Sequence, residues 1–126
     1  MNARPAAKVL IVEDDHDLRT TLADLLRDIG YTVAETQNGA EAIDYLKKHS
    51  PPRLILLDLV MPFMDGRSFL QARLADPRLR NTAVFLMTAH PNSRRGDFEA
   101  LSVDAIYQKP FRVRAFLADI HRTVAA

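Results

Sequence analysis

The sequence predicts a single α/β domain built on a parallel sheet with helices on both faces. Five short apolar runs alternate with segments of helical periodicity along the 126 residues, and strands that alternate with helices in this way pair in parallel through right-handed crossovers. Most of the apolar runs lack the polar alternation of a half-exposed strand, which is typical of strands buried on both faces. A chain of this length also suffices for one domain with a substantial core.

The composition excludes several classes of site and surface. Apolar residues make up 48% of the chain and charged residues 26%, which is typical of a soluble globular protein. The absence of cysteine excludes disulfides, thiolate metal sites and thiol nucleophiles. A net charge of +1 does not indicate a nucleic-acid or membrane surface, and no apolar stretch approaches the ~18 residues of a membrane span. Because the chain also opens without a secretory pattern, we expect a cytoplasmic protein.

The first half of the chain supplies two strand–helix pairs. We expect a central, β-branched strand over residues 8–12 and a more polar strand over 31–35, which suits a sheet edge. Asp17 is expected to cap the first helix and Gly30 to end it. The apolar face of that helix comprises Leu18, Leu22, Leu25, Leu26 and Ile29. The second helix follows the turn at Asn38-Gly39, ends at Ser50-Pro51-Pro52 and carries Ala42, Ile43 and Leu46.

The second half supplies three further strands, which we expect over residues 54–58, 83–88 and 105–108. The first of these is apolar until it reaches Asp58, and Pro62 with Asp65-Gly66 then forces a loop. An acidic side chain at the carboxyl end of a buried parallel strand lies where open α/β sheets bind their ligands.

Three helices complete the pattern. One is expected over residues 67–75, closed by Pro77, and a short, weakly amphipathic one over 94–101. The last helix has an apolar stripe formed by Phe111, Val113, Phe116, Leu117, Ile120 and Val124.

Two topologies are common at this length, the flavodoxin-like strand order 2-1-3-4-5 and a half-Rossmann sheet. Acids follow the first strand where a dinucleotide site needs a glycine-rich loop, which argues against dinucleotide binding.

Polar residues gather at the predicted carboxyl ends of the strands. They are Glu13-Asp14-Asp15, Asp58, Thr88 and Lys109. Each could simply cap a helix or face solvent, but parallel strands bring these ends to one edge of the sheet. Two carboxylates ~4 Å apart repel by about 4 kcal/mol at an effective dielectric near 20, so the acids need compensation. Lys109 offsets part of this repulsion, and an all-oxygen site with open positions suits Mg²⁺.

Such a site is suited to phosphoryl transfer. A carboxylate can act as nucleophile and form an aspartyl-phosphate. The cation and Lys109 would neutralise charge on the phosphoryl oxygens, and the hydroxyl of Thr88 could hydrogen-bond the acquired group. This gives the phosphoryl group a means of moving the loop after the fourth strand.

Four motifs resemble the receiver domain of bacterial two-component response regulators, over essentially the whole chain. They are Val9-Leu10-Ile11-Val12-Glu13-Asp14-Asp15, Leu57-Asp58-Leu59-Val60-Met61-Pro62-Phe63-Met64-Asp65-Gly66, Met87-Thr88-Ala89 and Lys109-Pro110-Phe111. The resemblance, which is to the single-domain, chemotaxis-regulator type, implies a flavodoxin-like (βα)5 sandwich of strand order 2-1-3-4-5. We expect one receiver domain over residues 1–126, with an ordered core from about 7 to 125.

The resemblance also implies the site chemistry. Asp58 would accept a phosphoryl group from a phosphohistidine on a sensor histidine kinase or a histidine phosphotransfer protein. The implied ligands of Mg²⁺, or of Mn²⁺ in its place, are Glu13, Asp14, Asp58 and the backbone carbonyl of Val60. Lys109 would bind the phosphoryl group. The peptide bond between Lys109 and Pro110 would be cis. Thr88 would be the switch hydroxyl, and the small Ala89 would leave the phosphoryl group room.

Some positions depart from the family pattern. Ile106 stands where Tyr or Phe is usual, and Tyr107 follows one place later, on the opposite face of the strand. A threonine–aromatic rotamer switch of the usual kind is therefore not expected. Ser102-Val103 stands where Gly-Ala is common, so the turn before the fifth strand should differ. Val60 and His90 occupy positions that influence hydrolysis of the acyl phosphate in this family.

We therefore expect a signalling phosphoacceptor, not an enzyme, that is a monomer or weak dimer without direct nucleic-acid or membrane contact. One helix remains after Lys109, so its output should pass to a downstream protein through the fourth helix, fifth strand and fifth helix. This face carries Arg94, Arg95, Asp97, Arg112 and Arg114. An ordinary solvated surface would account for these charged residues equally well. One alternative is a degenerate receiver that acts as a constitutive binding module. The other is a haloacid-dehalogenase-type phosphohydrolase, which needs a second Asp where Val60 stands.

Overall fold

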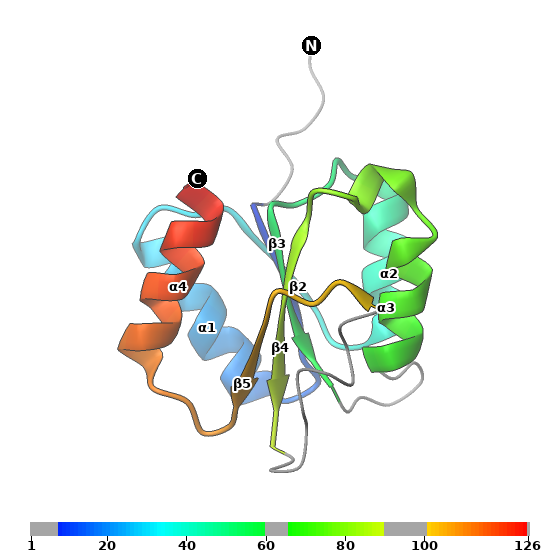
Figure 1. The fold of residues 1–126 in the computed structure, drawn as a ribbon. Coiled ribbons are helices and arrows are strands. Elements are labelled where there is room, and N and C mark those ends of the chain that lie inside the picture. Colours follow the sequence, from blue (N-terminus) through cyan, green and yellow to red (C-terminus); the bar gives the residue numbers. More distant parts are fainter. Residues whose placement is uncertain (1–7, 60–65, 90–100, 126) are drawn as a thin grey trace.

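The computed structural model describes residues 8–59, 66–89 and 101–125 (Figure 1). From β1 to β4 strands and helices alternate as predicted. Their bounds are β1 (Val9–Val12), α1 (His16–Asp28), β2 (Val33–Thr36), α2 (Gly39–Lys48), β3 (Leu54–Asp58), α3 (Gly66–Leu74), the 3₁₀-helix η1 (Pro77–Leu79), β4 (Ala83–Thr88), β5 (Ala105–Gln108) and α4 (Val113–Ala125). The helix predicted over residues 94–101 lies largely outside the described residues.

The five strands form one sheet of order β2-β1-β3-β4-β5. Every neighbouring pair is parallel, so the predicted 2-1-3-4-5 order is confirmed and the half-Rossmann alternative is excluded. The polar strand β2 lies at an edge, as expected. Figure 1 shows α1 and α4 on one face of the sheet and α2 and α3 on the other. All carboxyl ends of the strands therefore meet at one edge, the lower one in Figure 1.

The core consists of two apolar clusters, one on each face of the sheet. Alternate residues of β1 and β3 contribute to opposite clusters, because side chains alternate along a strand. Leu10 and Ile55 pack towards α2 and α3, whereas Ile11 and Leu56 pack towards α1 and α4. All the residues of β1 and the four apolar residues of β3 are fully buried, and each such aliphatic side chain contributes about 1.5–3 kcal/mol before entropy is subtracted.

Two details of α1 correct the prediction. Asp15, and not Asp17, caps the helix: its side chain accepts hydrogen bonds from the backbone N–H groups of Asp17 and Leu18. Ile29 was expected on the apolar face but is 53% exposed, because the helix ends at Asp28 and Ile29 is already the C-cap. Gly30 follows with φ +103°, a conformation that favours glycine, so the predicted stop is confirmed.

The strands β3, β4 and β5 have the predicted bounds. In α4 the buried stripe comprises Phe116, Ile120 and Val124. Val113 was predicted to belong to that stripe, which is wrong: it is the first residue of the helix and is 44% exposed. Ser102, in the turn before β5, adopts φ +59° in the left-handed region that favours glycine, so the expectation that this turn differs from a glycine turn is not supported.

Candidate functional site

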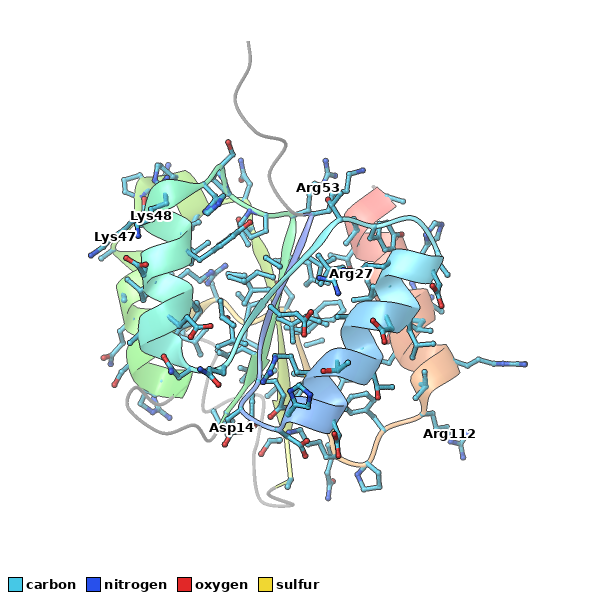
Figure 2. All side chains as sticks on the ribbon, turned by 180° about the vertical axis from the view of Figure 1, so that it is seen from behind. Asp14, Arg27, Lys47, Lys48, Arg53 and Arg112 are labelled. Carbon is cyan, nitrogen blue, oxygen red and sulfur yellow. The ribbon has the colours of Figure 1, made fainter. Side chains whose placement is uncertain are left out.

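Three carboxylates meet where β1 and β3 end. Val12 pairs with Leu57, so the next residues, Glu13 and Asp58, lie side by side, and Asp14 follows directly. One carboxylate oxygen of each acid lies within 4.8 Å of the other two. Glu13 is fully buried and Asp58 is 6% exposed, whereas Asp14 is exposed. Figure 2 shows Asp14 at the carboxyl edge of the sheet, so the site opens to solvent on the side of this residue.

Lys109 supplies the positive charge of the site. It directly follows β5, and its backbone N–H donates to the carbonyl of Thr88 at 2.6 Å. Its Nζ lies 2.6 Å from Oε1 of Glu13 and 3.5 Å from Oδ1 of Asp58. The side chain thus reaches from the edge strand to the middle of the sheet and contacts both buried acids. The peptide bond between Lys109 and Pro110 is cis, which confirms that expectation.

Burial and mutual repulsion change the protonation of these groups. The pKa of Glu13 is raised to about 7: burial has the largest effect and raises it, the hydrogen bond from Lys109 lowers it, and the charge of Asp58 also raises it. Burial alone would lower the pKa of Lys109, but its hydrogen bond to Glu13 and the charges of both acids leave that pKa raised. Lys109 therefore stays positively charged at neutral pH, and the acids hold less negative charge than three ordinary carboxylates.

Backbone contacts fix the turn that bears Glu13. Its N–H donates to the carbonyl of Thr36 on β2 at 3.0 Å, and its Oε2 accepts from the N–H of Asp15 at 3.2 Å. Its own carbonyl accepts a hydrogen bond from the Arg19 guanidinium at 2.9 Å. Arg19 was not identified from the sequence as part of the site. The signal that could have indicated it was a cation in the second turn of a helix that begins beside acids.

Thr88 and Ala89 lie at the end of β4, across the site from β1. Thr88 is 1% exposed and pairs with Gln108, while Ala89 is exposed. Beside them lies an open, mainly apolar hollow of about 510 Å³, lined by Asp15, Leu18, Ala89, Lys109, Pro110, Phe111 and Val113. Val60 and His90, also named in the sequence, lie outside the described residues.

The two residues before the end of β5 face opposite layers, as period-two alternation predicts. Ile106 packs against the cluster under α2 and α3, whereas Tyr107 belongs to the other cluster. The Tyr107 ring meets that of Phe116 edge-on, with centroids 4.7 Å apart. Its hydroxyl donates to Asp119 of α4 at 2.6 Å. The aromatic residue of β5 thus contacts α4 on the face away from α2 and α3.

The expected output face is described only in part. Arg112 and Arg114 are exposed at the start of α4, whereas Arg94, Arg95 and Asp97 lie outside the described residues. Among the described helices, none is long and apolar enough to cross a membrane.

Comparison with known proteins identifies the family of this chain. The family model of the response regulator receiver domain matches residues 9–121. The chain belongs to the response regulator receiver domain family. It is therefore a receiver domain of the two-component type, a signalling module and not a classical enzyme, and the phosphohydrolase alternative is not supported.

Individual relatives cover nearly the whole chain. The response regulator receiver protein CpdR of Brucella abortus is 32% identical over 120 residues, which are 94% of this chain and 98% of CpdR. The chemotaxis protein CheY4 of Vibrio cholerae is 27% identical with a TM-score of 0.84, covering 94% of this chain and 99% of that one. The receiver domain of sensor histidine kinase PA1611 from Pseudomonas aeruginosa, with a magnesium ion coordinated in its active-site cleft, is 25% identical with a TM-score of 0.81. That match covers 97% of this chain and 100% of the PA1611 domain.

Proposed function

We propose that this receiver domain is a phosphoacceptor in which Asp58 takes a phosphoryl group in a Mg²⁺-dependent reaction. The donor is a phosphohistidine on a sensor histidine kinase or a histidine phosphotransfer protein. The observation that supports this proposal is a cluster of acids that includes the nucleophile, with the ammonium group of a lysine beside it. Oxygens of Glu13, Asp14 and Asp58 lie within 4.8 Å of one another, and the Lys109 ammonium lies 3.5 Å from Asp58.

The donor set fits a hard divalent cation. Carboxylate oxygens are the ligands that Mg²⁺ prefers, and it commonly binds one or two carboxylates while keeping several waters. Glu13, Asp14 and Asp58 would hold it, with the carbonyl of Val60 as a further ligand by family resemblance, and Mn²⁺ would be accepted in its place. The PA1611 receiver domain, which is similar in fold, has magnesium in its cleft. Bound there, the ion would neutralise the acids and would withdraw charge from the phosphoryl oxygens.

The residues of the site have separate roles in phosphoryl transfer. A carboxylate oxygen of Asp58 forms a bond to phosphorus as the bond from phosphorus to the imidazole nitrogen of the donor breaks. Lys109 shifts from the acids to the incoming phosphoryl oxygens, and the Thr88 hydroxyl donates a hydrogen bond to them. Ala89 leaves this space free, and Pro110 fixes the segment that carries Lys109. His90, Val60 and Ile106 modulate hydrolysis and switching.

We propose that the phosphorylated state is recognised through protein contacts. The face used comprises the segment before β5, β5 itself and α4, and the partner is a downstream protein, not nucleic acid or a membrane. The domain acts in the cytoplasm as a monomer or weak dimer.

Phosphorylation of the purified protein tests this proposal. Incubation with acetyl phosphate and Mg²⁺ should add one phosphoryl group by intact mass, stable in acid and lost in base. Asp58→Asn should not be labelled. Asp44→Asn, which alters an exposed acid of α2 that pairs with Lys48, should be labelled like the wild type.

The degenerate-receiver alternative predicts a different result. A wild-type protein that stays unlabelled with small donors and with histidine kinases alike would contradict the phosphoacceptor proposal and favour constitutive binding.

A further inference from the structure

We infer that Arg19 is a positioning residue of the metal site, which holds the turn between Glu13 and Asp14 in the orientation that Mg²⁺ requires. The inference rests on the proposed function of that site. It adds a residue that touches neither the ion nor the phosphoryl group but acts through the acids.

The guanidinium of Arg19 contacts three separate parts of the molecule. One terminal nitrogen donates to the carbonyl oxygen of Glu13 at 2.9 Å, and the other lies 3.0 Å from Nδ1 of His16. Because arginine has no acceptor, this His16 nitrogen must accept. Nε lies 3.5 Å from Oε1 of Glu35 on β2. The side chain is only 13% exposed, so these contacts occur in a largely desolvated position.

The carbonyl that Arg19 binds belongs to the peptide between two of the three acids. A peptide unit is planar, so fixing the direction of this carbonyl also fixes the positions of the Cα atoms of Glu13 and Asp14. Glu13 is held independently by its N–H bond to Thr36, whereas Asp14 is exposed. The peptide after Asp14 is restrained by the hydrogen bond from the N–H of Asp15 to Glu13, and Arg19 restrains the peptide before it, so Arg19 helps to set where the more exposed acid points.

The charge of Arg19 would by itself oppose a divalent cation, since like charges repel. Glu35 offsets this effect, and it is bound from the other side by Arg27, whose guanidinium nitrogen lies 3.0 Å from Oε2. The positioning effect and the charge effect of Arg19 therefore have opposite signs for Mg²⁺ affinity. Our inference is that positioning dominates.

Arginine is needed at this position because its planar fork can donate to several acceptors at once. Lysine carries the same charge as a single compact ammonium and does not reproduce this geometry. Arg19→Lys thus separates charge from geometry, and Arg19→Ala removes both.

Mg²⁺ titration by isothermal calorimetry tests the inference without relying on phosphorylation. Loss of a contact that orients metal ligands typically weakens metal binding 10–100-fold, so Kd should rise roughly tenfold or more in Arg19→Ala and should also rise in Arg19→Lys.

Arg27→Ala is the matched control. Arg27 is on the same helix and pairs with the same Glu35, but its other hydrogen bond goes to the carbonyl of Val33. Figure 2 shows it well away from Asp14. Its Kd for Mg²⁺ should remain within about twofold of the wild-type value, because its contacts do not reach the metal-binding turn.

The outcomes separate this inference from the function on which it rests. An unchanged or lower Kd in folded Arg19→Ala, or in Arg19→Lys if the alanine variant does not fold, would overturn the positioning role. An equal rise in Arg27→Ala would also overturn it, since the effect would then be general to α1. Absence of Mg²⁺ binding by the wild type would instead overturn the proposed metal site itself.

Discussion

Glu13 has surroundings unlike those of an ordinary carboxyl group. It is fully buried, and its pKa is raised from 4.5 to about 7 by burial, despite the hydrogen bond from Lys109. Between these two pH values the folded, metal-free protein holds a proton at Glu13 that the unfolded chain releases. Stability from this group is therefore fully present below pH 4.5 and is lost as pH rises to about 7.

Comparison of wild type with Glu13→Gln should reveal this linkage. With EDTA present, the free energy of unfolding of the variant relative to wild type should increase between pH 5 and pH 8. The increase should be on the order of 2–3 kcal/mol, because one pKa unit corresponds to about 1.4 kcal/mol. Urea unfolding at the two pH values measures it, and the comparison cancels the contribution of other groups such as Asp76, whose pKa is lowered by Arg78. A difference that does not depend on pH would contradict the assignment.

The sequence predicted most of the residues that lie together at the site. Glu13, Asp14, Asp58, Thr88 and Lys109 each follow or end a strand, and parallel strands bring such residues to one edge whatever their separation in the chain. Arg19 was not predicted: a cation near the acids was visible in the sequence, but its contact depends on how α1 is rotated about its axis relative to β1. That rotation is decided by tertiary packing of the helix.

The elements themselves were predicted best where the apolar runs are continuous. β3 and β4 are almost wholly buried, and their ends coincide with polar residues, so their bounds were predicted to the residue. The start of α1 was harder, because Asp14, Asp15 and Asp17 are all capable N-caps. The alternation of Ile106 and Tyr107 was predictable, since it follows from the strand period alone.

The contribution of the α1 N-cap to stability can be measured by substitution. Asp15→Ala removes the acceptor for two backbone N–H groups and should lower the free energy of unfolding by about 1 kcal/mol, within a range of roughly 0.5–2. Asp17→Ala removes only a charge in the first turn, so its effect should be about 0.3–1 kcal/mol. Guanidinium unfolding in EDTA compares the two variants. A larger loss in Asp17→Ala would mean that the helix begins later in solution.

The whole molecule is organised so that one small site joins distant parts of the chain. The acids and Lys109 come from the ends of β1, β3 and β5, which are first, third and last in sequence. In the metal-free protein Lys109 links the ends of all three strands, because it follows β5 and contacts both Glu13 after β1 and Asp58 at the end of β3. A cation that binds the three acids would therefore stabilise the fold as a unit, because it binds the folded chain and not the unfolded one.

Thermal unfolding with and without Mg²⁺ should show this coupling. At 100 times its dissociation constant the ion should add about 2.7 kcal/mol to the free energy of unfolding, which corresponds to a rise in Tm of roughly 10 °C for 126 residues. The rise should be smaller at pH 5 than at pH 8, because the proton held by Glu13 competes with the ion. Asp14→Asn is the informative variant, since this acid is exposed and its replacement should leave the metal-free Tm nearly unchanged while removing most of the rise. An equal rise in Asp14→Asn would mean that Mg²⁺ stabilises the fold from another place, and no rise in the wild type would exclude the metal site.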